Sequence, residues 1–262
     1  MTGSYNACNP ELSIWLCHES TEGTPTVPHW LTTTEQQTVA KFSGPRKREY
    51  LTSRWLIRQA IAGASGQNAS DCWPVDGRPV CSQNPSGWRL SLSHSHGLSA
   101  CATSRNMPIG VDIEPLGRHP RWQKLAKRWF TPQEQDWLIN AGSAETFLTV
   151  WTLKEAWLKA TERGIAGHLQ ALEVEPGFKL NGDRPEQGWQ ACCYHVNGFL
   201  VTLVYQQPAN SDTTCIPGIR ILVPPTSSLL LGQPTVLATL TVPVLQRRIA
   251  PGSAPRNPSQ RR

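Results

Sequence analysis

The sequence predicts a protein of the α+β class, with helices and antiparallel strands in each half of the chain. Capping boxes at 32–35 and 131–134 predict a helix start in both halves. Alternating apolar and polar residues at 89–94 and 190–195 predict strands in both halves. Asn197-Gly198, which follows the second of these runs and precedes another, is a strong hairpin signal.

The first half is expected to begin with two helices and to continue with strands. The capping box opens a short helix to about residue 42, and Pro45 suits the first turn of a longer one to about residue 62. Asp76-Gly77-Arg78-Pro79 is a typical turn sequence. The expected strands are 89–94, 98–103 and 109–114.

The second half is expected to hold helices first and a hairpin afterwards. The expected helices are 120–130, a helix after Thr131, and 144–163. The expected hairpin joins 190–195 to 199–205. Beyond Gln207 the chain is rich in proline and poor in acids, so 208–262 is expected to be a largely disordered tail, with room for a short strand at 219–223.

Charge and cysteine usage limit the class of protein. The net charge of the 262 residues is +6, but the tail carries six basic residues and one acid, which leaves the body nearly neutral. A nucleic-acid-binding module driven by the tail is therefore disfavoured. The eight cysteines form no C-x-x-C pair and are expected to be reduced thiols in a cytoplasmic protein. No signal pattern and no membrane-spanning apolar run is visible.

Two carboxylates lie two residues apart on an expected strand. Asp112 and Glu114 would face the same side of that strand, between apolar neighbours that face the core. Mg²⁺ prefers hard oxygen ligands and is often held by one or two carboxylates together with substrate phosphates. A solvated strand face explains this pattern too, so both interpretations stay open here.

The helix near residue 150 carries a second pair of charges. Glu155 and Lys159 are four residues apart and therefore neighbours on a helix surface. They form either an ordinary surface ion pair or a third metal ligand beside a lysine that binds phosphate. A diphosphate substrate needs both a cation held by acids and a lysine for the leaving group. His94, flanked by serines, and Arg78 in the turn are further candidates for anion binding.

Four motifs in order carry a resemblance to a known family. The motifs are SLSHS, GVDIE, KRWFTPQE and WTLKEAWLK, at 91–95, 110–114, 127–134 and 151–159. Together they resemble the 4′-phosphopantetheinyl transferase superfamily, in its larger, surfactin-synthetase-activator-like branch, over about residues 30–207. The resemblance implies a pseudo-twofold arrangement of two similar α+β halves, 1–110 and 111–207. Coenzyme A would lie in the cleft between them.

The resemblance also implies residue roles. Asp112, Glu114 and Glu155 look like the family's Mg²⁺ ligands, and Lys159 looks like the lysine that meets the pyrophosphate. His94 resembles the histidine at a coenzyme A phosphate, and Arg78 sits where the family places a basic residue near the adenosine 3′-phosphate. The basic residue expected from the early helix is Arg48, with three alternatives left open: Arg46, Lys47 and Arg54. Glu134 matches a family glutamate near the active site, and its capping-box position explains it equally well.

The implied reaction transfers the 4′-phosphopantetheine arm of coenzyme A to a serine of an apo carrier protein, by a monomeric enzyme. The form of the helix motif resembles branches that serve fatty-acid, polyketide or polyunsaturated lipid carriers more than those that serve peptide synthetases. The resemblance implies that the carrier docks beside the cleft through an acidic helix. The candidate docking residues are Arg118, Arg121, Lys124 and Arg128. The alternative is that these four residues are only solvated, and the sequence favours neither interpretation. The alternative enzyme is a Mg²⁺ nuclease or phosphohydrolase that uses the same three acids. Leu116 counts against it, because restriction-type nucleases commonly place a lysine there.

Overall fold

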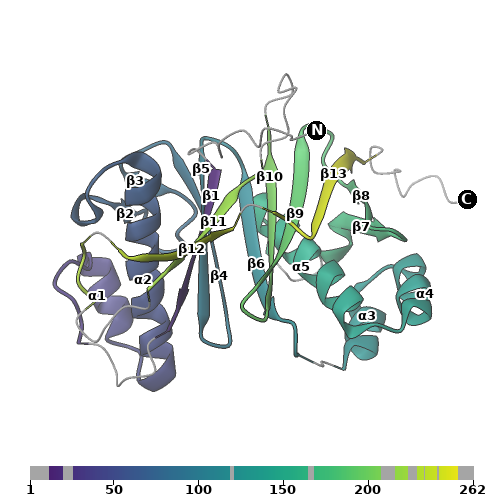
Figure 1. Cartoon of the computed structure of the whole chain (residues 1–262), viewed down its shortest axis with the longest axis horizontal. Helices are drawn as coiled ribbons and strands as arrows, with labels where there is room; N and C mark the ends of the chain where they lie inside the picture. Colours follow the sequence, from purple (N-terminus) through teal and green to yellow (C-terminus); the bar gives the residue numbers. More distant parts are fainter. Residues whose placement is uncertain are drawn as a thin grey trace, which may run out of the picture.

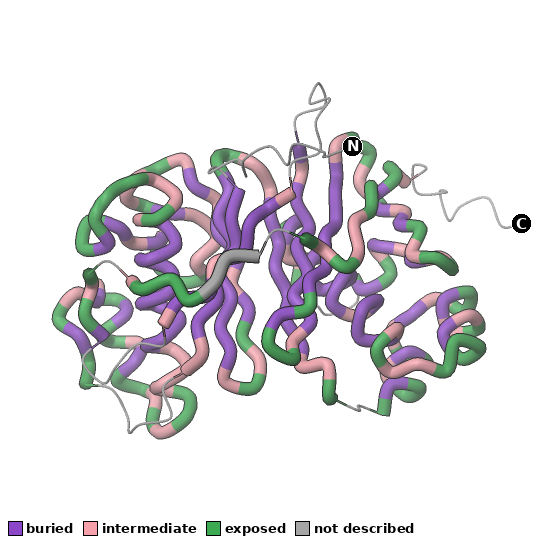
Figure 2. The backbone as a smooth tube through the Cα atoms, in the orientation of Figure 1, coloured by how far each residue is buried: buried purple, intermediate pink, exposed green. Residues whose placement is uncertain are grey.

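Two sheets lie face to face at the centre of the molecule, and helices cover their outer faces (Figure 1). The computed structural model describes residues 12–19, 26–118, 121–164, 168–207, 216–223, 229–232, 234–240 and 242–252. Strands β1, β5, β6, β9, β10 and β11 contribute the apolar residues between the sheets. Figure 2 shows this central region as continuously buried. The architecture confirms the predicted α+β class and its two halves.

The first half combines one sheet with two main helices. Its helices are α1 (Thr33–Val39) and α2 (Gly44–Ser65), followed by the short 3₁₀ helix η1 (Ala69–Asp71). Its strands are β1 (Leu12–His18), β2 (Trp73–Pro74), β3 (Ser82–Asn84), β4 (Trp88–Ser95) and β5 (Leu98–Arg105). Helix α2 packs its apolar residues on the outer face of β1 and β5.

The second half repeats this plan with an additional helix. Its helices are α3 (Trp122–Trp129), α4 (Pro132–Ala141), α5 (Ala144–Ala160) and the 3₁₀ helix η2 (Leu169–Ala171). Its strands are β6 (Ile109–Pro115), β7 (Leu172–Glu175), β8 (Lys179–Gly182), β9 (Trp189–Val196) and β10 (Phe199–Gln206). Helix α5 packs on the outer face of β6 and β10.

The two halves meet where β4 lies beside β6. Strand β4 is the last strand of the first sheet, whose order is β12-β11-β1-β5-β4. Strand β6 is the first of the second sheet, whose order is β6-β10-β9-β13-β8-β7. Ser91 Oγ accepts the amide of Val111 at 2.9 Å, so serines of β4 contact β6 directly.

Within the described part of 208–262, the short strand predicted at 219–223 is present, but the prediction that the rest of this tail is largely disordered was wrong. Three strands occur there: β11 (Gly218–Leu222), β12 (Val236–Leu240) and β13 (Leu245–Pro251). Strand β11 pairs in parallel with β1, and β13 pairs antiparallel with β9. Each of these segments forms a strand by pairing with a neighbouring strand, and this pairing outweighs the proline-rich composition. Residues 208–215, 224–228, 233, 241 and 253–262 lie outside the described part.

Two smaller observations complete the fold. All six described cysteines are free thiols, while Cys8 and Cys215 lie outside the described residues. Among the described residues, no helix combines the length and apolar character needed to cross a bilayer.

Candidate functional site

The acids predicted from two distant stretches come together in one cleft. Asp112 and Glu114 on β6 and Glu155 and Lys159 on α5 all line a cleft of about 400 Å³. Helix α5 reaches β6 closely because Gly110 has no side chain. A Cβ there would lie 2.0 Å from the carbonyl oxygen of Ala156, which is too close for any L residue.

Asp112 is held by two contacts. Lys159 Nζ donates to Asp112 Oδ1 at 2.8 Å, and Ser93 Oγ donates to the same oxygen at 2.9 Å. Lys159 Nζ also donates to the carbonyl of Val111 at 2.9 Å. The Lys159 side chain is 20% exposed, so its ammonium is fixed in place and still reaches the cleft.

Glu114 lies two residues further along β6, on the same face of the strand as Asp112. Arg118 Nη1 contacts its Oε1 at 2.6 Å, and Ser95 Oγ donates to its Oε2 at 3.3 Å. Ser93 and Ser95 of β4 therefore hold the two carboxylates of β6 across the junction between the halves.

Glu155 is the least compensated of the three acids. Burial, followed by the negative charge of Asp112, raises the pKa of Glu155 to about 7, although Lys159 opposes the shift and Glu114 adds to it. A carboxyl group beside two other carboxylates resists ionisation until a cation joins them.

These residues fit a hard divalent cation. Three oxygen donors face one cleft, and Lys159 is the cation that now contacts Asp112. Burial and then the negative charge of Asp112 raise the pKa of Glu155, and a bound cation would offset the second of these effects. Within the described ranges, however, no group of three His, Cys, Asp or Glu side chains is already arranged as a finished metal site.

The two residues predicted to bind anions also line the cleft. His94 on β4 and Arg78 in the 76–79 turn lie on the cleft wall that the first half provides. His94 Nδ1 lies 3.3 Å from Glu49 on α2, which also pairs with Arg46. This contact places α2 behind the histidine ring.

The basic residues of α2 are placed differently from the expectation. Arg48 does not line the cleft, and neither do its alternatives Arg46, Lys47 and Arg54. Arg46 is exposed and pairs with Glu49, whereas Arg54 is buried beside Glu35. Helical periodicity predicts the direction of each side chain around the helix axis only to within one residue. An error of one residue is enough to turn a side chain away from the cleft.

Glu134 lies in the core of the second half, and the cleft lining does not include it. It closes the capping box at Thr131 and accepts the amide of Val174 at 2.8 Å. Its Oε1 lies 2.6 Å from Nζ of the fully buried Lys154. These contacts are those of a helix cap, which was one of its two interpretations.

Sequence reasoning missed three residues of the site. Ser93, Ser95 and Trp151 contact or line the acids, and none was a candidate for that role. The signal available was the spacing of Ser91, Ser93 and Ser95, which a strand places on one face. Their partner strand is visible only in three dimensions.

Comparisons with known proteins identify the family of the chain. Residues 108–204 match the model of the 4′-phosphopantetheinyl transferase superfamily, and residues 34–104 match that of the 4′-phosphopantetheinyl transferase N-terminal domain. The two matches divide close to the junction between β5 and β6.

Several curated proteins are similar to the chain. A Synechocystis sp. protein, slr0495, provisionally named a 4′-phosphopantetheinyl transferase, is 33% identical over 68% of this chain and 76% of its own length. The 4′-phosphopantetheinyl transferase HetI of Nostoc sp. is 32% identical over 49% of this chain and 57% of its own length. The 4′-phosphopantetheinyl transferase psf-1 of Bacillus pumilus is 35% identical over 37% of this chain and 41% of its own length. With both halves matched, the chain belongs to the 4′-phosphopantetheinyl transferase superfamily, in its surfactin-synthetase-activator-like branch.

Proposed function

We propose that this enzyme takes its phosphopantetheine from coenzyme A, depends on Mg²⁺, and uses the cleft between β4, β6 and α5. As a member of its family it transfers phosphopantetheine to carrier proteins. One observation carries the proposal: three acids and Lys159, from β6 and α5, converge in a cleft that His94 and Arg78 also line. A diphosphate with an additional phosphate on its nucleoside matches this mixture of acids and cations.

Each side chain then has a defined task. Arg78 binds the adenosine 3′-phosphate and His94 binds a phosphate of the diphosphate. The carrier serine hydroxyl attacks the β-phosphorus, a new serine O–P bond forms, and the bond from that phosphorus to the bridging oxygen breaks. Lys159 stabilises the charge on the leaving adenosine 3′,5′-bisphosphate. Glu155 takes the serine proton, directly or through a water, or serves as a metal ligand alone.

Asp112, Glu114 and Glu155 are the residues that would hold Mg²⁺. When bound, the ion neutralises charge on the pyrophosphate and orients it. Lys159 would remain beside the site, because its bond to the Val111 carbonyl does not depend on Asp112.

Glu155→Gln tests the proposal. We expect turnover of an apo carrier, followed by intact mass spectrometry, to fall about 100-fold or more. Calorimetric titration with Mg²⁺ in the presence of coenzyme A then separates the two roles of Glu155. A variant with unchanged turnover and unchanged Mg²⁺ binding would remove Glu155 from both roles. Glu145→Gln, on the first turn of the same helix and outside the cleft, is the matched control.

The carrier is proposed to dock beside the cleft on α3. Arg121, Lys124 and Arg128 are exposed there, while Trp122 and Ala126 face the core. Arg118 is already paired with Glu114, so it belongs to the site more than to the docking surface. Unchanged carrier affinity after charge reversal at Arg121 and Lys124 would show that these residues are only solvated.

The proposal extends to the compartment, the oligomeric state and the acceptor of the enzyme. The enzyme acts as a cytoplasmic monomer without nucleic acid or membrane partners, and its free cysteines agree with a reducing compartment. The family assignment favours the transferase over a nuclease built on the same acids. Screening apo carriers of fatty-acid, polyketide and peptide pathways by mass would identify the natural acceptor.

A further inference from the structure

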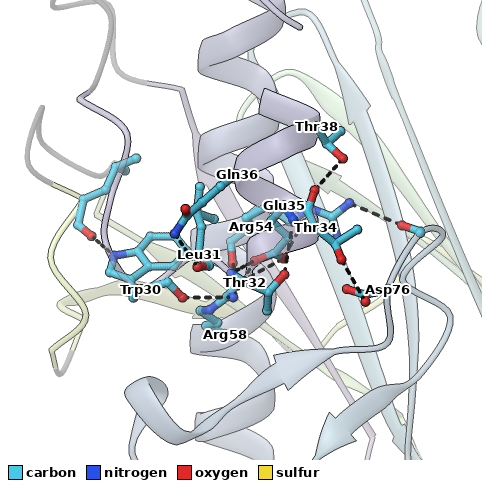
Figure 3. A network of polar contacts seen from close by, with 12 residues as sticks. Trp30, Leu31, Thr32, Thr34, Glu35, Gln36, Thr38, Arg54, Arg58 and Asp76 are labelled. Atoms are coloured by element: carbon cyan, nitrogen blue, oxygen red, sulfur yellow. Dashed lines mark hydrogen bonds and ion pairs between the residues drawn. The ribbon is translucent and has the colours of Figure 1, made fainter. Parts of the chain in front are cut away.

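The turn that carries Arg78 is fixed to the helices behind it by two contacts (Figure 3). Thr34 Oγ1 on α1 donates to Asp76 Oδ2 at 3.0 Å. Arg54 Nη2 on α2 donates to the carbonyl of Gly77 at 3.5 Å. The two residues that precede Arg78 are therefore both held by contacts to α1 and α2.

Arg54 is an unusual residue to find at this depth. It is 9% exposed, and its Nε lies 3.7 Å from Oε1 of the buried Glu35 without a hydrogen-bond partner. Its guanidinium also stacks on the ring of Tyr50, 4.7 Å from the ring centroid. A buried guanidinium costs free energy unless its contacts compensate for the lost water.

Glu35 does not need Arg54 for charge balance. Arg58 binds Glu35 through two nitrogens, at 2.6 Å to Oε2 and 3.3 Å to Oε1. One buried carboxylate thus faces two buried guanidinium groups, and the closer of the two already pairs with it.

The second half shows that the scaffold works with a single cation. There the capping-box Glu134 pairs with Lys154 on α5. Four residues before Lys154 stands Val150, whereas Arg54 stands four residues before Arg58. What Arg54 adds to this plan is its bond to the turn that carries Arg78.

We infer that Arg54 is a positioning residue for coenzyme A recognition. It holds the 76–79 turn so that Arg78 presents its guanidinium to the 3′-phosphate, and it does not touch the substrate. The inference rests on the proposed function, which assigns that phosphate to Arg78. It also gives Arg54, one of the four basic candidates of α2, an indirect role in place of a direct contact.

The test compares coenzyme A with 3′-dephospho-coenzyme A by calorimetry. Arg54→Met removes the charge and the bond to Gly77, and should weaken coenzyme A binding roughly tenfold while changing dephospho-coenzyme A much less. Arg54→Lys keeps a cation beside Glu35 but lacks the planar guanidinium that contacts Gly77. It should therefore lose the preference for coenzyme A over 3′-dephospho-coenzyme A, as Arg54→Met does, and keep the wild-type melting temperature. Thr34→Val removes the other contact and should act in the same direction with a smaller effect.

A double-mutant cycle identifies the route of the effect. If Arg54 acts through Arg78, then Arg54→Lys should cause no further loss in an Arg78→Ala background. Additive losses, or an unchanged preference for coenzyme A in the Arg54 variants, would overturn the inference. If Arg78→Ala alone left the preference unchanged, the assignment of Arg78 would fail first, and this result is distinct from a failure of Arg54.

Discussion

The two halves share one scaffold, and comparing them separates what the fold requires from what the chemistry requires. Each has a long helix packed on a sheet that ends in a hairpin, β4–β5 in the first half and β9–β10 in the second. Both hairpins begin at a buried tryptophan, Trp88 or Trp189. The strand that pairs with each hairpin is β1 in one half and β6 in the other.

The registers of these strands align the two halves residue by residue. His18 pairs with Leu98 at the start of β5, and Pro115 pairs with Phe199 at the start of β10. Three residues before these positions stand Trp15 in the first half and Asp112 in the second. The same structural position therefore carries an indole ring in one half and a carboxylate that lines the cleft in the other.

The long helices repeat the contrast. Glu35 and Arg58 in the first half correspond to Glu134 and Lys154 in the second. Five residues beyond each cation stand Gly63 and Lys159. In the first half, the Trp15 ring packs on Gly63. At the corresponding positions of the second half, Lys159 pairs with Asp112.

The comparison teaches a simple distinction. Buried capping-box glutamates paired with helix cations occur in both halves and belong to the scaffold. The Asp112–Lys159 pair occurs in one half only, where the other half has the apolar Trp15–Gly63 contact, and we assign this pair to the proposed chemistry. Substitutions at corresponding positions of the two halves should therefore differ in whether they change stability alone or also change activity.

Asp112 and Trp15 should give the largest contrast. Asp112→Asn removes a charge from the site, and we expect the rate of carrier loading to fall about 100-fold or more, with the melting temperature nearly unchanged. Trp15→Phe should lower stability and leave the rate per folded molecule near that of the wild type. Mass-spectrometric initial rates and thermal melts measure both. Asp112→Asn with more than about a tenth of wild-type turnover would contradict the assignment.

Gly110 and Gly63 form a second matched pair. An added Cβ at Gly110 would lie 2.0 Å from the α5 backbone, and one at Gly63 would lie 2.1 Å from the Trp15 ring. Alanine at either position should destabilise the fold by about 2 kcal/mol. Only Gly110→Ala should also slow turnover, because it moves Glu155 and Lys159 away from Asp112. Equal activity losses, measured below the unfolding transition of both variants, would mean that the close approach of α5 to β6 does not set the site.

The sequence predicted the local parts of this fold well and their assembly less well. Capping at Thr32 and Thr131, and the hairpin at Asn197-Gly198, depend on neighbouring residues, and the structure has them there. Apolar alternation also placed Asp112 and Glu114 on one face of β6, because Ile109, Val111 and Ile113 face the core.

The hydrophobic and turn patterns of the sequence do not predict contacts between segments that are distant in the chain. Strand β13 pairs with β9, which no local composition reveals, whereas β11 was expected as a short strand and only its partner β1 was missed. The partners of Ser93 and Arg54 follow from how elements pack, and a helix period does not specify rotation well enough to place Arg48. The internal repeat was equally hidden, since its corresponding residues, such as Trp15 and Asp112, differ in chemistry.

The pKa of Glu155 gives a third way to sharpen the comparison. Its value of about 7 lies above the usual 4.5, so the metal-free folded protein binds this proton more tightly than the unfolded chain. This contribution to stability is present below about pH 4.5 and is lost as pH rises through about 7. Relative to Glu155→Gln, the metal-free wild type should therefore lose about 1–3 °C in melting temperature between pH 5 and pH 8.

Mg²⁺ should reverse the trend, because the ionised carboxylate binds it. We expect Mg²⁺ to raise the melting temperature of the wild type at pH 8 and much less at pH 5. The Gln59→Asn variant serves as control, because Gln59 occupies the position of Glu155 in the first half and carries no charge. A Mg²⁺ effect of the same size in Glu155→Gln would place the ion elsewhere.

The smallest predicted effect uses a contact that both halves possess. His94 Nδ1 lies 3.3 Å from Glu49, and His195 Nε2 lies 3.4 Å from Glu145, at corresponding places on the two helices. Of these two histidines, only His94 lines the cleft. Glu49→Gln should raise the KM for coenzyme A about threefold with little change in kcat, because His94 loses the partner that orients its ring. Glu145→Gln should leave both constants unchanged. If the two variants behaved alike, His94 would be as remote from the substrate as His195, and the scaffold rather than the chemistry would explain both histidines.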